Sequence, residues 1–288
     1  MPSVAARLPL YASLTRLDKP VGTLLLLWPT LTALWIAAGG WPGATLFAVF
    51  IAGTFLMRSA GCAVNDAADA RYDAHVKRTA HRVVARGLVS RREALAVALA
   101  LACAAALLLP LLNAAALRLA LIAVAIAATY PLAKRFFPVP QLYLGVAFSF
   151  GIPMAFAAVL ATVPIIGWLL MLANAFWVIA YDTEYAMVDR DDDLRLGLQS
   201  SAIFLGRFDI AAVMACYAAF LLLLLYIGTR TQAGWPFYAG CAAAAMMMLY
   251  HFILIRTRSR EGCLRAFRHN NWVGLAVFAG AVLDFAMR

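Results

Sequence analysis

The sequence predicts an all-α, polytopic membrane protein that forms a single domain over residues 1–288. Hydrophobic residues make up 65% of the 288 residues and charged residues only 13%, whereas a soluble domain carries about 25% charged residues. Residues 20–57, 136–181 and 210–229 contain no charged side chain. Uncharged apolar runs of about 18 or more residues are typical of helices that cross a bilayer. The protein is therefore expected to be embedded in lipid.

Prolines, glycines and an asparagine divide the apolar sequence into nine predicted spans, because these residues interrupt helices. The segment 39–43 separates the first two spans, and Pro110 and Asn113 separate the third from the fourth. The first apolar run is longer than the core of a signal peptide, which has about 7–15 residues, so we expect an uncleaved span. The predicted spans are 21–39, one that starts near Ala44, 92–111, 115–134, 141–160, 164–181, 208–228, 235–255 and 269–286.

Positive charges fall almost entirely on one predicted face of the membrane. Of the 24 Lys and Arg residues, 21 lie in the N-terminal segment and the even-numbered loops, and only Arg118, Arg230 and Arg288 lie on the other face. Cytoplasmic loops carry such an excess of positive charge, so the N-terminus is expected in the cytoplasm. This orientation also accounts for the net charge of +10, and no nucleic-acid partner is expected.

Eleven of the 14 acidic residues lie in two segments that are four predicted spans apart. This layout suggests two four-helix units, about 20–134 and 139–255, each with one acidic segment, plus a last helix at about 269–286. In the first segment, Asn65, Asp69 and Asp73 are four residues apart and share one helical face, and Asp66 lies beside them. In the second segment, Asp182, Asp189 and Asp193 again share one face. We predict two acidic stripes at helix ends on the same side of the bilayer.

Closely packed carboxylates repel one another unless cations neutralise them. Mg²⁺ prefers oxygen ligands and typically uses one or two carboxylates together with substrate phosphates. Two facing stripes therefore predict a Mg²⁺–diphosphate site. The cations expected to complete it are Lys77, Arg78, Arg82 and Lys134. The alternative interpretation is a pair of solvated, charged loops.

Arg58 is predicted to lie inside the hydrocarbon region. Fourteen apolar residues separate it from the expected start of its helix near Ala44, which is roughly 21 Å of a core about 30 Å thick. A charge at that depth is costly and indicates a functional residue. Two roles remain open, a salt bridge to Asp69 or the binding of a substrate carboxylate.

The two acidic motifs, Asn65-Asp66-x-x-Asp69-x-x-x-Asp73 and Asp189-x-x-x-Asp193, resemble the signature motifs of the UbiA family of intramembrane prenyltransferases. The resemblance extends from Asp18 to the last spans. Within the family, Gly22–Thr30 and Tyr181–Asp189 are most similar to the enzymes that prenylate 4-hydroxybenzoate in ubiquinone biosynthesis, and Lys77–Thr79 and Tyr130-Pro131 also fit. Val83 departs from the pattern, since a proline is expected after Arg82.

The resemblance implies nine helices around a central cavity that opens sideways to lipid, in a bacterial inner membrane. It implies Mg²⁺ as cofactor, with polyprenyl diphosphate and 4-hydroxybenzoate as substrates and no obligate protein partner. The aromatic acid would be held by Arg58, the diphosphate would contact Arg78 and Lys134, and Asp182 would assist the phenol. The expected site comprises the catalytic residues Asp69, Asp182 and Asp189, the substrate-binding residues Arg58, Asn65, Arg78, Tyr130 and Lys134, and the metal ligands Asn65, Asp66, Asp69, Asp73, Asp189 and Asp193.

Three alternatives stay open. The same family includes enzymes with other acceptors, such as haem or another quinone precursor. An ion-coupled transporter would place its carboxylates near the membrane midplane, whereas these carboxylates are predicted at helix ends. A diphosphate-binding scaffold without catalysis would carry the same motifs. Tyr130, Tyr143, Phe148 and Phe150 are candidates for shielding an allylic cation face-on, although ordinary packing is the simpler role.

Overall fold

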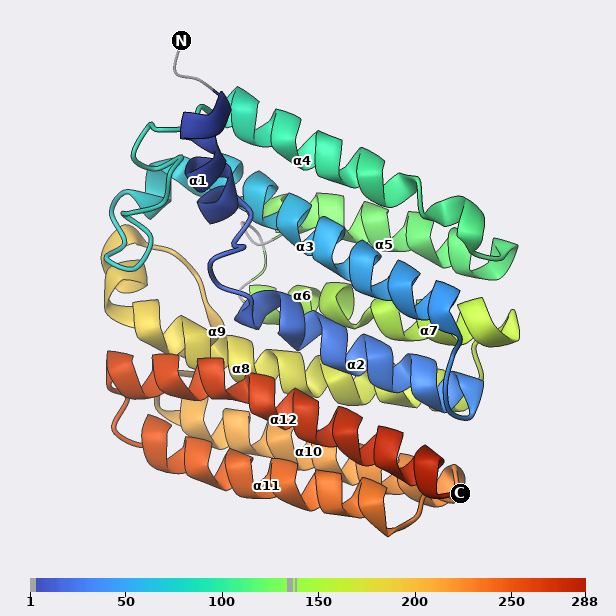
Figure 1. Ribbon diagram of the computed structural model, residues 1–288. Helices are drawn as coiled ribbons and strands as arrows, with labels where there is room; N and C mark the ends of the chain where they lie inside the picture. Colours follow the sequence, from blue (N-terminus) through green and yellow to red (C-terminus); the bar gives the residue numbers. More distant parts are fainter. Residues whose placement is uncertain (1–3, 134–136, 138) are drawn as a thin grey trace.

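The computed structural model describes residues 4–133, 137 and 139–288, and its regular structure is helical (Figure 1). No strand occurs among these residues, and the predicted all-α class is confirmed. Two short 3₁₀ turns, Leu109–Leu111 and Gly206–Phe208, interrupt the connections. The α-helices are α1 (Val4–Leu14), α2 (Val21–Ala38), α3 (Ala44–Asp73), α4 (Arg91–Ala106), α5 (Ala114–Ala133), α6 (Pro140–Ser149), α7 (Gly151–Leu160), α8 (Ile165–Leu196), α9 (Ser201–Leu205), α10 (Asp209–Arg230), α11 (Trp235–Ile255) and α12 (Arg260–Met287).

Within the described residues, each of the nine predicted spans coincides for most of its length with helix. Within the described residues, eight segments are long and apolar enough to cross a membrane, and α5 adds a shorter apolar stretch at Ala114–Tyr130. The fifth predicted span is formed by α6 and α7, which follow one another as the apolar run Pro140–Leu160. The protein is therefore an integral membrane protein, and the arrangement into two four-helix units stays a prediction.

Two helices are longer than a bilayer crossing requires, because they include the predicted acidic segments. Helix α3 has 30 residues and α8 has 32, which correspond to about 45 and 48 Å of rise, more than the roughly 30 Å of a hydrocarbon core. The sixth span was predicted to end at residue 181, where charge begins. The helix continues because its acidic residues keep the helical period. It ends where Gly197 adopts a left-handed conformation with φ 65°, as Gly39 does with φ 66° at the end of α2.

Helix α1 was not predicted, because its 11 residues are too short and too mixed in character to resemble a span. It lies near the start of α4, where Arg7 and Tyr11 contact Glu93 at 2.5 and 2.6 Å. At its end, Leu14 is fully buried in a small apolar cluster with Val83. Burial of Val83 shows how this chain accommodates a valine where a proline was expected. The cluster holds the loop after α3 against the bundle.

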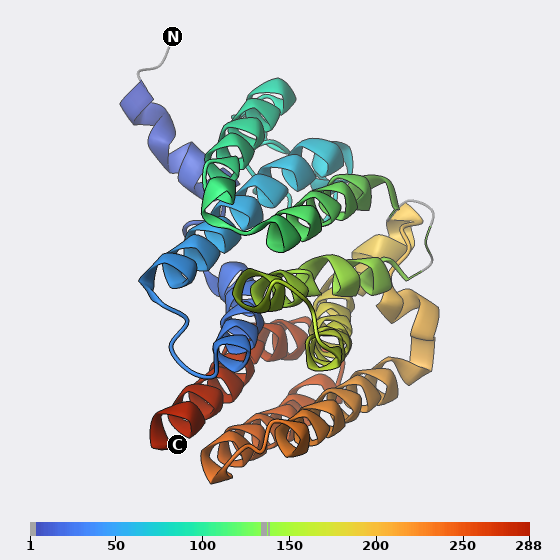
Figure 2. The same ribbon diagram turned by 90° about the vertical axis from the view of Figure 1, so that its right-hand side faces the viewer.

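The long helices run side by side and leave α8 in the middle of the bundle. In both views α3, α4 and α5 lie on one side and α10, α11 and α12 on the other (Figures 1 and 2). Helix α8 packs against α2, α6, α7, α9, α10 and α12. Helices α11 and α12 pack tightly at Gly240, where a Cβ atom would lie 2.6 Å from the carbonyl oxygen of Ala276. Small residues permit such contact between membrane helices.

A buried hydrogen-bonded network links α8 to the C-terminal helices. Asn270 on α12 accepts a hydrogen bond from Trp177 Nε1 (2.8 Å) and donates one to Glu184 Oε2 (2.9 Å). Tyr217 on α10 donates to Glu184 Oε1 at 2.8 Å and contacts His251 Nδ1 at 3.0 Å. Buried polar groups need such partners, so this network fixes how α8 packs against α10 and α12.

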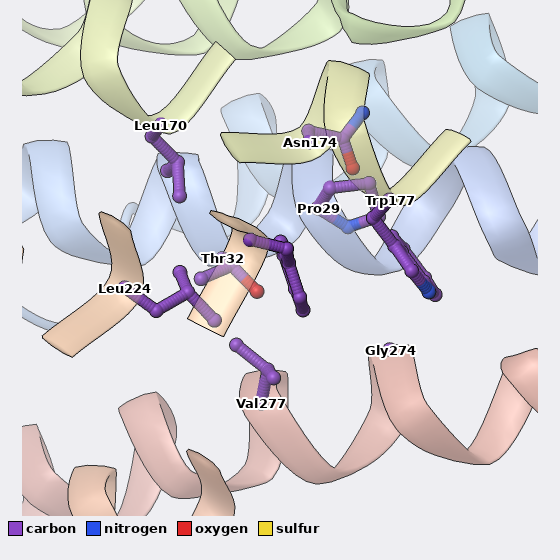
Figure 3. A pocket seen from close by; sticks show the side chains of 9 residues that line it. Pro29, Thr32, Leu170, Asn174, Trp177, Leu224, Gly274 and Val277 are labelled. Carbon is purple, nitrogen blue, oxygen red and sulfur yellow. The ribbon is translucent and has the colours of Figure 1, made fainter. Parts of the chain in front are cut away.

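A small pocket lies beside this network. It has a volume of about 20 Å³, close to the size needed for one water molecule. Asn174 and Trp177 reach it from α8 and Thr32 from α2 (Figure 3). Asn174 Oδ1 is buried without a hydrogen-bond partner among the described residues. The pocket has no acidic lining residue, so it is a packing feature of the bundle and not part of the acidic site.

Replacing Asn270 by leucine is expected to destabilise the protein, because Trp177 Nε1 and one oxygen of Glu184 would lose their partner. Each buried polar group left unpaired costs about 1–3 kcal/mol, so we expect a lower melting temperature in detergent. Arg265→Ala is the matched control on α12, since its pair with Glu261 is exposed and such pairs contribute little. Equal melting temperatures for both variants would contradict the structural role of the network.

Candidate functional site

The first acidic segment forms the last turns of α3. Asn65 and Asp69 are half-buried, and Asp66 and Asp73 are buried. The loop that follows α3 folds back on this segment, because Thr79 Oγ1 donates a hydrogen bond to the carbonyl oxygen of Asp73 at 3.0 Å. The four oxygen-bearing side chains are thus held on one helix end, as the four-residue spacing predicted.

Arginines neutralise two of these carboxylates. Asp66 binds Arg16 at 2.7 Å and Arg82 at 3.2 Å, and Asp73 binds Arg82 at 2.8 Å. Asp66 is only 1% exposed, so its ion pairs tie α3 to the segment before α2 and to the loop after α3. Asp66 was expected among the metal ligands, whereas the structure engages it in these two ion pairs.

The second acidic segment lies in the last third of α8. Arg78 binds Asp189 through Nη2 at 2.5 Å and through Nε at 2.9 Å. Asp192 accepts hydrogen bonds from Arg260 at 2.9 Å and from the backbone N–H of Lys77 at 3.2 Å. Asp193 is half-buried and has no ion-pair partner among the described residues.

The two acidic segments meet at one end of the bundle. Lys77 and Arg78 belong to the loop that follows the first segment, and both bind aspartates of the second. Figure 1 shows this end at the left, where α1, the loop after α3 and the end of α8 gather. The facing arrangement that the site requires is therefore present.

Arg58 lies deeper in the bundle, seven residues before Asn65 on α3. Its guanidinium is 5.5 Å from the ring centre of Phe148 on α6. It also interacts electrostatically with Asp182 on α8 and Tyr130 on α5. Tyr130 also interacts electrostatically with Asp69. Residues from α3, α5, α6 and α8 thus converge below the acidic segments.

The acidic end of the bundle is surrounded by positive charge. In the loop after α3, partial burial lowers the pKa of the His81 imidazole, and the charges of Lys19, Arg16 and Arg82 lower it further. His81 is consequently neutral at neutral pH. A loop that disfavours an added positive charge is suited to attract an anion such as a diphosphate.

The oxygen-rich donor set fits a hard divalent cation. Asn65, Asp69, Asp73, Asp189 and Asp193 offer only carboxylate and amide oxygens, which Mg²⁺ prefers. Among the described residues, no three metal-binding side chains converge closely enough to hold an ion by themselves. A Mg²⁺ ion that completes its coordination with water and substrate phosphate needs only one or two carboxylates from the protein.

The other predicted residues are Lys134 and the aromatic side chains near Tyr130. Lys134 lies outside the described residues. Tyr143 packs beside Tyr130 with ring centres 6.2 Å apart, and Phe150 is buried in the bundle. The cation-shielding role of the aromatic side chains stays a prediction.

The sequence interpretation missed three contributors. Tyr185 lies under the Arg78 guanidinium, 4.2 Å from ring centre to Cζ, and its hydroxyl contacts the same arginine. It precedes Asp189 by four residues, so helical spacing was the available signal. Arg16 and Arg260 bind the acidic segments from distant parts of the chain, and no local pattern marks them.

A further polar group points to the deep part of the site. The Tyr181 side chain is only 2% exposed, yet its hydroxyl has no hydrogen-bond partner among the described residues. The same side chain interacts electrostatically with Arg58 and Asp182. A buried hydroxyl without a partner is costly and is available to a bound molecule.

Relatives of known sequence match the entire chain. Residues 26–273 match the UbiA prenyltransferase family. A protein of Cupriavidus metallidurans named 4-hydroxybenzoate octaprenyltransferase is 60% identical over 287 residues, which cover 100% of this chain and 98% of the relative. A protein of Methylobacillus flagellatus with the same name is 56% identical over 281 residues, covering 98% and 95%.

Solved structures agree with the helical arrangement. The apo structure of a UbiA homolog from Aeropyrum pernix K1 superposes with a TM-score of 0.79 at 29% identity, covering 91% of this chain and 97% of the homolog. A UbiA homolog from Archaeoglobus fulgidus bound to GPP and Mg²⁺ has a TM-score of 0.74 at 16% identity, covering 96% and 99%, which shows a shared fold. On these matches and on the facing acidic motifs, the chain belongs to the UbiA prenyltransferase family.

Proposed function

We propose that this protein transfers a polyprenyl group from polyprenyl diphosphate to 4-hydroxybenzoate, at the ring carbon ortho to the hydroxyl, and releases diphosphate. The reaction would serve ubiquinone biosynthesis in a bacterial inner membrane, with the N-terminus and the acidic end in the cytoplasm. Full-length relatives that are 56–60% identical carry the name 4-hydroxybenzoate octaprenyltransferase. The positive charges of the even-numbered loops support the orientation.

The observation that carries the proposal is that Arg58 lies deeper in the bundle than the two acidic segments, seven residues before Asn65 on α3. Arg58 provides a cation for a carboxylate, and Asp69 and Asp189 flank the place where a diphosphate and its metal would bind. Tyr130 lies between these levels, since it interacts with Arg58, Asp69 and Asp182. An acid-bearing acceptor and an anionic donor therefore each have a complementary partner at one site.

The diphosphate would be held through Mg²⁺ by Asn65, Asp69, Asp73, Asp189 and Asp193. Asp66, which was predicted with this set, differs from the other aspartates because two arginines, Arg16 and Arg82, pair with its carboxylate and it is only 1% exposed; its role as a metal ligand stays a prediction. When bound, Mg²⁺ supplies positive charge that stabilises the leaving diphosphate.

Arg78 and Lys134 would contact the diphosphate directly. Arg78 is held on the second segment by Asp189 and Tyr185, so its guanidinium is positioned where negative charge develops as the bond between the prenyl C1 and the diphosphate oxygen breaks. Fixed donors at such a position stabilise a transition state strongly. The bonding electron pair leaves with the diphosphate.

The acceptor would be oriented by its two ends. Arg58 would bind the carboxylate, and Asp182 would accept a hydrogen bond or the proton from the phenol. Sharing or loss of its hydroxyl proton would make the phenol ring more electron-rich, so its ortho carbon would attack the allylic carbon and form a carbon–carbon bond. The ring proton would then pass to a base such as the released diphosphate, which restores the aromatic ring. The surrounding helices exclude water, which would otherwise capture the allylic cation.

This arrangement favours a carboxylate-bearing acceptor over the other acceptors of the family, because Arg58 places a guanidinium beside Asp182 and Tyr130, where an acceptor carboxylate would find a cation. It also disfavours an ion-coupled transporter. The carboxylates lie at the ends of α3 and α8, whereas transporter sites lie near the midplane.

Membranes that contain the protein are expected to form one prenylated product from 4-hydroxybenzoate and labelled prenyl diphosphate. A series of prenyl diphosphates of different length will show the preferred donor. EDTA should stop turnover, because the aspartates need a divalent ion to bind the diphosphate, and excess Mg²⁺ should restore it. Turnover that continues in EDTA would contradict the proposed metal site.

Asp69→Asn and Asp189→Asn are each expected to lower kcat/KM by about 10²–10³-fold, as loss of transition-state charge stabilisation does. Asp191→Asn is the matched control, because Asp191 is 71% exposed two residues from Asp189 and should keep normal activity. The comparison is made by single-turnover product formation on folded protein. Normal rates in both test variants would refute the shared metal site.

Arg58→Ala is expected to raise the KM for 4-hydroxybenzoate by about 10–100-fold, because a hydrogen bond to a charged group contributes about 1.5–3 kcal/mol. The KM for prenyl diphosphate should change little. Arg118→Ala serves as control, since Arg118 is exposed at the opposite end of the bundle. A rise confined to the diphosphate KM would reverse the assignment of Arg58.

A further inference from the structure

Gly22 leaves the space that the Arg58 guanidinium occupies. It lies in the first turn of α2, beside the middle of α3. A Cβ atom built on Gly22 would lie 2.7 Å from Nη2, 3.1 Å from Nε and 3.3 Å from Cζ of Arg58. Heavy atoms without a bond or hydrogen bond prefer about 3.5–4.0 Å. Any side chain at position 22 is therefore incompatible with the present position of the guanidinium.

The backbone gives no reason for a glycine at this position. Gly22 is part of the helix Val21–Ala38 and is not among the residues with positive φ. Alanine is more favourable than glycine in a helix by about 1 kcal/mol. The missing Cβ thus carries a cost in helix stability, and the contact that explains it is the one with Arg58.

The guanidinium is confined from two sides. Gly22 on α2 borders it on one side, and the Phe148 ring on α6 lies 5.5 Å from its Cζ. Asp182 on α8 attracts it. Its position is therefore set by neighbouring helices and not by its own flexible stem alone.

We propose that Gly22 is a positioning residue for acceptor binding, which acts through Arg58. Having no side chain, it lets the guanidinium lie where it binds the acceptor carboxylate, and it thereby contributes to the preference for a phenol that carries a carboxylate. This inference rests on the proposed function, in which Arg58 binds that carboxylate.

A methyl group at position 22 displaces the guanidinium and leaves the helix in place. The atoms it would approach belong to the far end of a flexible side chain, so the arginine gives way before the backbone does. A displacement of about 1 Å in a positioned group can lower the rate up to about 10²-fold. The displacement would weaken binding of the acceptor carboxylate, which contacts Arg58, and would leave binding of the diphosphate at the acidic segments unchanged.

The first test compares Gly22→Ala with Gly61→Ala, a control on α3 at which a Cβ atom meets nothing within 4 Å. Gly22→Ala should raise the KM for 4-hydroxybenzoate about tenfold or more, and leave the KM for prenyl diphosphate and the melting temperature as in Gly61→Ala. An unchanged KM for 4-hydroxybenzoate would overturn the inference. So would an equal rise for both substrates, or a fall in melting temperature, since either means that the backbone gave way.

The second test is a double-mutant cycle with Arg58→Ala, measured at high 4-hydroxybenzoate concentration. If Gly22 acts through the guanidinium, adding Gly22→Ala to Arg58→Ala should not raise the KM further. A further rise would overturn the inference. Failure of the wild-type protein to prenylate 4-hydroxybenzoate would instead overturn the proposed function, together with the inference that rests on it.

Discussion

The ion pair between Arg78 and Asp189 is the interaction on which the geometry of the site depends. It joins the loop that follows α3 to the middle of the acidic stripe on α8, so two segments more than 100 residues apart in the chain face one another. The hydrogen bond from Lys77 to Asp192 reinforces the same junction, and the ion pair between Arg260 and Asp192 ties the end of α8 to the start of α12. Without these contacts, like-charged helix ends would repel one another.

The body of the bundle serves this charged end. Helix α8 is held on its far side by the buried network around Asn270 and Glu184, which leaves its other face with Asp182 and Asp189 for the site. Because the network uses hydrogen bonds with defined directions, it fixes the rotation of α8 about its axis more strictly than apolar packing alone. The buried polar residues therefore fix the rotation of α8, and this rotation determines where its acidic residues lie.

Much of this architecture could be predicted from the sequence, because hydropathy and helical spacing are local properties. The nine spans and the two acidic helix faces follow from runs and periods that any window of the chain reveals. Partners supplied by distant residues could not be predicted in this way. Asp66 has the spacing of a metal ligand, but its ion pair with Arg16 depends on how α1 packs. The apolar span was predicted to end at residue 181, and the spacing of Asp182, Asp189 and Asp193 predicted that the helix continues beyond it, as α8 does.

Helix α3 carries both Arg58 and the first acidic segment without interruption, so it sets the distance between these two parts of the site. Arg58 and Asn65 are seven residues apart without a break between them, so their separation along the axis is about 10 Å. If Arg58 binds the acceptor carboxylate and Asn65 the diphosphate, as proposed, this separation leaves room for a single aromatic ring between them. Since no hinge interrupts this stretch, movement of the surrounding loops would change access to the site. The separation of Arg58 and Asn65 along the helix axis would stay the same.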